Sequence, residues 1–365
     1  MKKEKLKVFL QYPWKISDSQ YYKNILDYPP KGVEYLSEKT RVGMITNKKK
    51  LAFLNSFKAH ARSFVKKFRL NIPNMKKTRN DIDYDLIHCA HCLSGNNSPW
   101  VADFESYWQM WVSAKDDEKG REKISKILEK ENCKKLIAWT EASKRTIIKN
   151  FPLIKDKIEV VYHGQPVQKF KKIRKEKITL LFIGRYFRGK GGLYALEVMD
   201  RLTKKYENVD GLFISVTPKE VLEKYSSNKK IKFLGLIPHK EIQEEIFPLA
   251  DILIYPGFSD TFGFIFTEAM SFGVPVVTVD GFARKELVEN NKTGFVIPRK
   301  KEIHYSKIDE EIVKKMIEKT EKLINDGRLR KRMSKESLKT ISNGKFSIRE
   351  RNNKLGRIYR GAFED

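Results

Sequence analysis

The chain has little cysteine and no long apolar run. Its 365 residues include only three cysteines, too few and odd in number for a disulfide framework, so we expect free thiols in a reducing compartment. The longest apolar stretches, such as 249–255 and 274–279, are interrupted within a few residues and are far shorter than the roughly 20 residues of a membrane-spanning helix. After the basic N-terminus only Val8 to Leu10 are apolar, too few for a signal peptide. These absences predict a cytoplasmic globular protein.

Acidic residues are also scarce. The chain carries 74 Lys and Arg against 46 Asp and Glu, a net charge of +28. Between residues 39 and 79 there is no Asp or Glu, against thirteen Lys and Arg. Such an excess is typical of proteins that meet polyanions or anionic surfaces, and nucleic acid, anionic lipid and nucleotide phosphates all qualify. The alternative is that the lysines cover solvated faces of the fold.

Residues 51–70 inside this acid-free stretch predict a basic amphipathic helix. Phe53, Phe57, Ala61, Phe64 and Phe68 fall on one helical face, with basic residues largely elsewhere. A helix of this kind packs on a domain core or docks on anionic lipid headgroups. Both interpretations stay open at this point.

Short β-branched runs alternate with helical patterns along the whole chain. This alternation predicts an α/β fold of two Rossmann-like, doubly wound domains. We expect an N-terminal domain over 1–170, a C-terminal domain over 171–345 and a helix over 346–365 that packs back on the first; the boundary is the charged segment 168–177. A ligand would bind in the cleft between the domains, at the carboxyl ends of the strands. The predicted strands are 7–12, 41–46, 84–91, 100–104, 135–140, 159–163, 178–183, 211–216, 231–234, 252–255, 276–279 and 294–297.

The segment Gly184–Gly191 lies between a predicted strand and a predicted helix and nearly spells a P-loop. A P-loop requires Ser or Thr after its lysine to bind magnesium, and here Gly191 follows Lys190. The glycines instead favour a metal-free diphosphate site, to which Arg185 and Lys190 add charge. The alternative is a tight turn with solvated cations.

A pair of carboxylates, Asp260 and Glu268, is separated by eight residues. Asp260 lies in the turn after a predicted strand and Glu268 lies two turns into the next helix, so both can face one site. Carboxylates bind paired hydroxyl groups, which makes a sugar or a ribose a plausible ligand. Alone, the pair would favour a helix N-cap at Asp260 and a surface position for Glu268.

Taken together and in order, the motifs resemble the donor domain of the retaining GT-B glycosyltransferases of family 4, the glycosyl transferases group 1. The resemblance covers residues 133–362, and before Cys133 only the architecture matches. The matching motifs are Gly184-Arg185 with Lys190-Gly191, Asp260 to Glu268, Glu268-Ala269-Met270, Gly273 to Val277, Thr293-Gly294, Val160 to Gly164, Phe233-Leu234-Gly235 with Pro238-His239, and Ala250-Asp251.

The resemblance implies that Arg185 and Lys190 bind the donor diphosphate, that Glu268 binds the ribose and that Asp260 touches the transferred sugar. Asp260 stands where the family pattern usually has Glu. The donor-binding residues implied are Gly184, Arg185, Lys190, Gly235, Ile237, Phe262, Gly263, Phe264 and Glu268. No cofactor or metal is implied, because the nucleotide sugar is a co-substrate and the cations and a helix N-terminus stabilise the leaving diphosphate.

Two further clusters lie in the first half of the chain. Glu105 directly follows the strand expected at 100–104, at the place where many family members have a His, and Asp103 is nearby. A carboxylate there would orient the acceptor hydroxyl, or would simply be solvated. The run His88 to Cys92 looks like a zinc knuckle, but no second Cys/His cluster follows, so a strand end is the favoured interpretation. On a strand, Cys89 and His91 would share one face, and His88 and Cys92 the other.

The resemblance therefore implies a retaining, metal-independent hexosyltransferase of polysaccharide or glycolipid biosynthesis. It would use a nucleotide-sugar donor and a glycan or lipid-linked acceptor, and it would contact the inner face of a membrane through residues 39–79. Two alternatives are a P-loop-like NTPase and a basic nucleic-acid-binding protein, although no known nucleic-acid motif is present.

Overall fold

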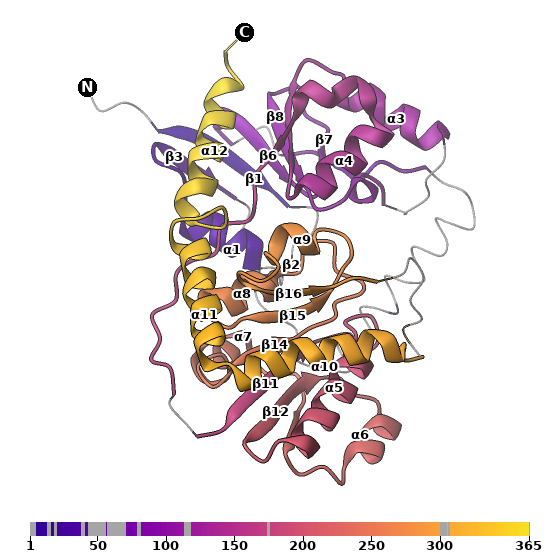
Figure 1. Cartoon of the computed structure of the whole chain (residues 1–365). Coiled ribbons are helices and arrows are strands. Elements are labelled where there is room, and N and C mark those ends of the chain that lie inside the picture. The colour runs from indigo at the N-terminus through magenta and orange to yellow at the C-terminus, as the bar shows by residue number, and fades with distance from the viewer. Residues whose placement is uncertain are drawn as a thin grey trace. The chain divides into compact units, whose positions relative to one another are not determined.

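The computed structural model describes residues 5–12, 16–17, 20–37, 41–42, 56, 71–78, 82–112, 118–173, 176–299, 305 and 307–364 (Figure 1). The chain divides into two compact units. Unit 1 comprises Met1–Gly164 with Ile348–Asp365, and unit 2 comprises Gln165–Ser347. The predicted helix over 51–70 lies outside the described residues, Ser56 apart. None of the helices described is long and apolar enough to cross a bilayer.

The boundaries between the units differ from those expected, 170/171 and 345/346. The charged segment that we interpreted as a linker belongs to unit 2 instead, because it is bound there. The ring of Phe170 packs 4.9 Å from that of Phe272, and the Ile173 amide donates to the Pro248 carbonyl at 3.2 Å. Gln165 and Phe346 are joined by a backbone hydrogen bond of 2.8 Å. The two connections between the units therefore leave unit 2 side by side.

Unit 1 is built on a six-stranded parallel sheet with the order β10-β9-β8-β6-β1-β3. Its strands are β1 (Leu6–Gln11), β3 (Val33–Leu36), β6 (Leu86–Ala90), β8 (Trp100–Phe104), β9 (Cys133–Ala138) and β10 (Ile158–Val160). The sequence analysis missed β3, a short edge strand. The strand expected at 41–46 is described only as β4 (Arg41–Val42), which pairs with β2 (Ile16–Ser17) in a separate small sheet. A second small sheet joins β5 (Met75–Lys76) and β7 (Leu93–Ser94).

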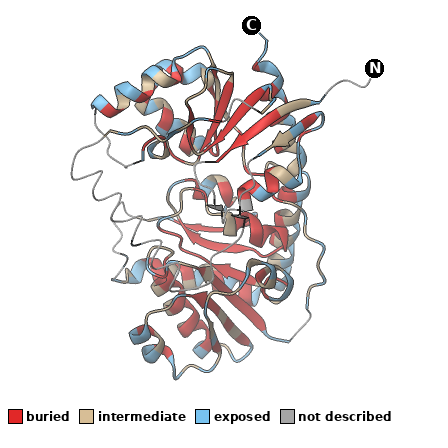
Figure 2. Cartoon of the chain, turned by 180° about the vertical axis from the view of Figure 1, so that it is seen from behind, coloured by how far each residue is buried: buried red, intermediate tan, exposed pale blue. Residues whose placement is uncertain are grey.

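Unit 2 repeats the architecture with a parallel sheet of order β13-β12-β11-β14-β15-β16. Its strands are β11 (Ile178–Gly184), β12 (Val209–Ser215), β13 (Ile231–Leu234), β14 (Ile252–Ile254), β15 (Val276–Val279) and β16 (Gly294–Ile297). Each corresponds to a predicted strand, and Figure 2 shows that both sheets are largely buried. The predicted α/β fold of two doubly wound, Rossmann-like sheets is confirmed.

Helices connect the strands and cover the sheets, as expected for parallel topology. In unit 1 they are α1 (Gln20–Asp27), η1 (Tyr107–Met110), α3 (Glu118–Leu128), α4 (Glu141–Asn150), η2 (Pro152–Lys157) and α12 (Ile348–Gly361). In unit 2 they are α5 (Gly192–Lys205), α6 (Lys219–Tyr225), α7 (His239–Glu241), η3 (Ile242–Ile246), α8 (Phe264–Ser271), α9 (Arg284–Leu287), α10 (Glu310–Asn325) and α11 (Gly327–Ser342).

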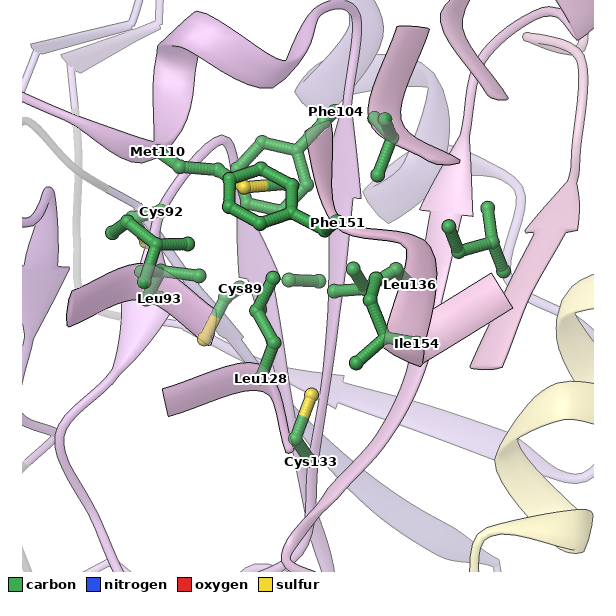
Figure 3. Packing of buried hydrophobic residues seen from close by; sticks show 14 of the residues in the cluster. Cys89, Cys92, Leu93, Phe104, Met110, Leu128, Cys133, Leu136, Phe151 and Ile154 are labelled. Atoms are coloured by element: carbon green, nitrogen blue, oxygen red, sulfur yellow. The ribbon is translucent and has the colours of Figure 1, made fainter. Parts of the chain in front are cut away.

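The three cysteines are core residues of unit 1. Cys89, Cys92 and Cys133 are free thiols buried among apolar side chains (Figure 3). Burial raises the pKa of the Cys133 thiol to about 12 and that of Cys89 well above its ordinary value, so both stay protonated. In the part of the chain that is described, no three His, Cys, Asp or Glu side chains gather as metal ligands.

The expected alternation of faces from His88 to Cys92 is wrong after Ala90. Strand β6 ends there, and His91 adopts a left-handed backbone with φ of 57°. This turn places Cys92 in the same apolar cluster as Cys89. His88 bonds the Tyr359 hydroxyl through Nδ1 at 2.7 Å, away from that cluster.

Helix α12 completes the core of unit 1. Leu355, Ile358 and Tyr359 are buried in a cluster with Val8, Leu86 and neighbouring strand residues. The buried Arg351 donates to the carbonyls of Asn24, at 3.1 Å, and Tyr28, at 2.5 Å. These carbonyls lie at the end of α1, where helix geometry leaves them without intrahelical partners. One buried guanidinium thus ties the last helix of the chain to the first.

Replacing Arg351 by Ala removes the guanidinium donor of the buried Asn24 carbonyl, while the Tyr28 carbonyl keeps a hydrogen bond of 3.1 Å from Asn352 Nδ2. We therefore expect Arg351→Ala to lower the free energy of unfolding by about 1–3 kcal/mol. The matched control is Arg357→Ala on the same helix. Its exposed side chain pairs with Glu159 at 2.9 Å at the surface, an interaction of about 0–1 kcal/mol. Urea unfolding followed by tryptophan fluorescence measures both, and similar midpoints for the two variants would contradict the role given to Arg351.

Candidate functional site

The turn between β11 and α5 is built from glycines that the packing requires. Gly191 precedes α5 with a φ of +76°, which L-residues rarely adopt. A Cβ on Gly184 would lie 2.9 Å from the Lys190 Cβ, and one on Gly192 would lie 2.5 Å from the Phe187 ring. The Gly192 amide donates to the Phe187 carbonyl at 2.8 Å. The segment is therefore a compact loop that carries Arg185 and Lys190 at the carboxyl end of β11.

A second turn packs directly on this one. Strands β11 and β14 are neighbours, so the loops that follow them meet at the same edge of the sheet. The amides of Gly257 and Ser259 donate to the carbonyls of Lys190 and Gly189, at 3.1 and 3.0 Å. A Cβ on Gly191 would lie only 2.5 Å from that of Pro256. Backbone contact between the two turns thus sets where Lys190 and Asp260 lie.

Asp260 is held by two side chains at this junction. Its Oδ1 pairs with the Lys190 ammonium, and its Oδ2 accepts a hydrogen bond of 2.7 Å from the Tyr255 hydroxyl. Burial and the Asp260 charge raise the pKa of Tyr255 well above its ordinary value, so this phenol remains a donor. The N-cap of α8 is Gly263, with φ of +86°, and not Asp260. The N-cap interpretation of Asp260 is therefore wrong.

Glu268 is buried on α8, so a surface position is also wrong. Its Oε1 lies 2.8 Å from Nε2 of His239, the first residue of α7. His239 belongs to the motif Pro238-His239, but the sequence pattern gave it no role. The sequence feature that could have indicated a role for His239 is its position at the start of a helix, after a loop that contains Gly235 and Pro238. Nothing in the spacing connected it with Glu268.

Arg284 is a second residue that sequence analysis missed. It is almost fully buried and donates through Nη1 to the Asp260 carbonyl at 3.0 Å and through Nη2 to the Gly257 carbonyl. Its guanidinium carbon lies 4.9 Å from the centre of the Phe266 ring. Arg284 therefore braces the turn that carries Asp260. No motif distinguishes it from the other basic residues of the chain.

The remaining predicted donor residues lie on the loops of unit 2. Phe262 is buried, with its ring 5.1 Å from that of Phe264, just before and at the start of α8. Gly235 and Ile237 lie in the loop between β13 and α7, and the Cβ position of Gly235 faces open space. The turns after β11, β13 and β14 thus bring cations, carboxylates and two helix N-termini to the carboxyl end of one sheet, an arrangement suited to an anionic ligand with hydroxyl groups.

Glu105 and Asp103 belong to unit 1 and differ in environment. Glu105 directly follows β8, is half-buried, and its amide donates to Gln109 Oε1 at 2.9 Å. Asp103 is fully buried, with Oδ2 at 3.1 Å from His88 Nε2 and Oδ1 accepting from the His91 amide at 3.2 Å. Burial raises the pKa of Asp103 well above its usual range and lowers those of His88 and His91 to about 3. Asp103 is thus part of the core.

The two parallel sheets, each covered by helices, define the GT-B class of fold. Residues 165–340, nearly all of unit 2, match the family model described as glycosyl transferases group 1. A glycosyltransferase from Rickettsia africae is similar in structure over 99% of both chains, with a TM-score of 0.64 and 16% identity. The Anabaena protein HepE, solved in complex with UDP and glucose, is also similar in structure. The match covers 97% of this chain and 99% of the HepE chain, with a TM-score of 0.61 and 14% identity.

A curated relative is similar in sequence. The phosphatidylinositol N-acetylglucosaminyltransferase GPI3 subunit of Saccharomyces cerevisiae is 24% identical over 179 residues, 45% of this chain. The chain spans 39% of the length of that subunit. The likeness thus concerns part of each protein.

We expect Gly191→Ala to lower the free energy of unfolding by about 2–4 kcal/mol, because it adds a left-handed non-glycine residue and a clash with Pro256. The matched control is Gly235→Ala, where no atom lies within 4 Å of the new Cβ; we expect a change within about 0.5 kcal/mol. Urea unfolding of both variants is the measurement. Equal stability of the two would show that the two turns do not need their close approach.

Proposed function

We propose that the protein is a retaining, metal-independent glycosyltransferase of family 4 that transfers a sugar from a nucleotide donor to a glycan or lipid-linked acceptor. The observation that carries the proposal is the meeting of Lys190 with Asp260 and of His239 with Glu268 at one edge of the unit 2 sheet. These residues lie inside the segment that matches glycosyl transferases group 1. The HepE structure with UDP and glucose supports a nucleotide-sugar donor.

The chemical demand on the site is to stabilise the diphosphate as it leaves the anomeric carbon. Arg185 and Lys190 lie in the loop between β11 and α5 and supply this charge. Lys190 has three N–H donors, so its ammonium can keep Asp260 and also bind a phosphate oxygen. We assign the backbone at Phe262, Gly263 and Phe264 to the sugar and the phosphate, at the N-terminal end of α8.

The carboxylates bind the hydroxyl groups of the donor. Asp260 keeps acceptor capacity after its bonds to Lys190 and Tyr255, because an ionised carboxylate has about four lone-pair sites. Glu268 is bound by His239 through Oε1, which leaves Oε2 for a ribose hydroxyl. His239 is thus a positioning residue that orients Glu268, and the loop with Gly235 and Ile237 borders the base.

The acceptor is assigned to unit 1. Glu105 at the carboxyl end of β8 orients the acceptor hydroxyl, and the acid-free stretch 39–79 meets the inner face of a membrane. The word phosphatidylinositol in the name of the yeast relative supports a lipid-linked acceptor. This assignment makes the protein a peripheral, cytoplasmic hexosyltransferase of polysaccharide or glycolipid biosynthesis.

The first test is a panel of UDP-, GDP- and ADP-sugars with and without EDTA. We expect one of them to raise the melting temperature and to undergo slow hydrolysis that EDTA does not inhibit, with release of the nucleoside diphosphate. Magnesium-dependent ATP hydrolysis without any response to sugars would favour the P-loop NTPase instead. Salt-sensitive nucleic-acid binding without turnover would favour the nucleic-acid-binding alternative.

Site variants test the roles of individual residues in the same assay. Glu268→Gln and Lys190→Met should each lower turnover at least about 100-fold with the fold intact, the scale of losing one group that stabilises the transition state. His239→Gln should mainly raise the donor KM, about tenfold, the scale of a hydrogen bond to a charged group. The controls are Glu244→Gln and Lys219→Met, at exposed surface pairs of unit 2. A folded Glu268→Gln with unchanged turnover would refute the site.

A further inference from the structure

Four exposed apolar side chains of unit 1 lie on two segments that run side by side. Ile72, Met75, Trp108 and Val112 are exposed by 40, 50, 43 and 40%. Pro73 and Trp111 form an antiparallel bridge, and the Val112 amide donates to the Ile72 carbonyl at 3.0 Å. We call the paired segments 72–75 and 108–112 the apolar ribbon. Single exposed apolar residues are ordinary, whereas several on adjoining segments indicate an interaction surface.

The ribbon is held firmly, so its outward side chains do not result from a loose segment. The Asn74 amide donates to the Met110 carbonyl at 2.7 Å, and its side-chain nitrogen donates to the carbonyls of His91 and Gln109, at 2.7 and 2.9 Å. Met110 and Trp111 are buried in the core of unit 1. The ribbon thus has a buried side that fixes it and an exposed side without an obvious role in the fold.

The charge beside the ribbon selects among possible occupants. Lys76 and Lys77 directly follow Met75, and they belong to the stretch of 39–79 that contains no Asp or Glu. Of the acids described between 71 and 112, Asp103 is buried and Glu105 is half-buried, while Asp83 and Asp85 precede β6, at the opposite end of the strand from His91. A tryptophan with other apolar side chains, flanked by lysines, fits the interface of an anionic bilayer, where rings lie among headgroups and lysines meet phosphates.

The position of the ribbon connects this surface with the sheet. The ribbon segment 108–112 follows β8 through Glu105 and Ser106, whose amides both donate to Gln109 Oε1, at 2.9 and 3.1 Å. Asn74 reaches His91, just beyond the carboxyl end of β6. The ribbon therefore borders the carboxyl edge of the unit 1 sheet, where Glu105 lies.

We propose that the apolar ribbon, with Lys76 and Lys77, docks unit 1 on an anionic lipid bilayer and so brings the carboxyl edge of its sheet to the lipid surface. The apolar side chains enter the headgroup region, and the lysines bind lipid phosphates. The further consequence, that Glu105 meets an acceptor carried by a lipid, rests on the proposed function. Lipid binding by itself rests on the ribbon and its lysines, and it narrows the membrane contact proposed for 39–79 to described residues.

Co-sedimentation of the full chain with vesicles tests the proposal. We expect binding to vesicles of phosphatidylcholine mixed with phosphatidylglycerol and little binding to phosphatidylcholine alone. Met75→Ser with Trp108→Ser should weaken binding at least about tenfold, and Lys76→Gln with Lys77→Gln should weaken it and reduce its dependence on salt. The matched control is Leu153→Ser, because Leu153 is exposed by 78% on η2 of the same unit. Met75→Ser alone serves if the double variant is less stable than the wild type.

Absence of binding to the anionic vesicles, or equal binding by the ribbon variants, would overturn the proposal. Concentration-dependent dimerisation that the ribbon variants abolish would also overturn it, because the occupant would then be a second copy of the chain. Hydrolysis of a nucleotide sugar in solution, measured on the same variants, separates the two proposals. Hydrolysis without vesicle binding refutes the docking surface and the membrane contact proposed for 39–79, but not the transfer of sugar from a nucleotide donor. Vesicle binding without a response to any nucleotide sugar refutes the proposed transfer alone.

Discussion

The close approach of two backbone turns is the constraint on which the candidate site of unit 2 depends. Gly191 meets Pro256 at a distance that leaves no room for a side chain, and the same contact aligns the carbonyls of Gly189 and Lys190 with amides of the next turn. Arg284 holds that second turn in place by donating hydrogen bonds to two of its carbonyls. Lys190 and Asp260 are thus positioned by buried backbone and not by their own mutual attraction, which is modest for a partly exposed pair.

Unit 1 uses buried polar groups for a different purpose. Arg351 and Tyr359 of α12 reach the end of α1 and His88 of β6, and His88 in turn contacts Asp103 of β8. These contacts join segments far apart in the chain, and burial lowers the pKa of His88 to about 3 and raises that of Asp103 well above its ordinary value. A polar network of this kind rigidifies one end of the sheet, so Glu105 and the apolar ribbon extend from a stable frame.

Much of the architecture followed from local patterns. Strands such as 100–104, 231–234 and 276–279 were predicted with their observed bounds, because short runs rich in β-branched and aromatic residues are typical of strands. The turn glycines were recognised because backbone geometry restricts them locally. The edge strand β3 was missed because it is short and only partly buried. The domain boundary at 168–177 was misplaced, because charge composition does not reveal that Phe170 and Lys172 bind unit 2.

The sequence by itself determined the two parallel sheets, the glycine turns and the candidate residues Arg185, Lys190, Asp260 and Glu268. Only the tertiary structure decided which partners these residues have: His239 for Glu268, Tyr255 and Lys190 for Asp260, and Arg284 beneath the turn. The physical reason is that strand and turn preferences act over a few neighbouring residues, whereas these contacts join loops that only the stacking of parallel strands brings to one edge. The exposed face of the apolar ribbon was likewise hidden, because exposure depends on what the rest of the fold covers.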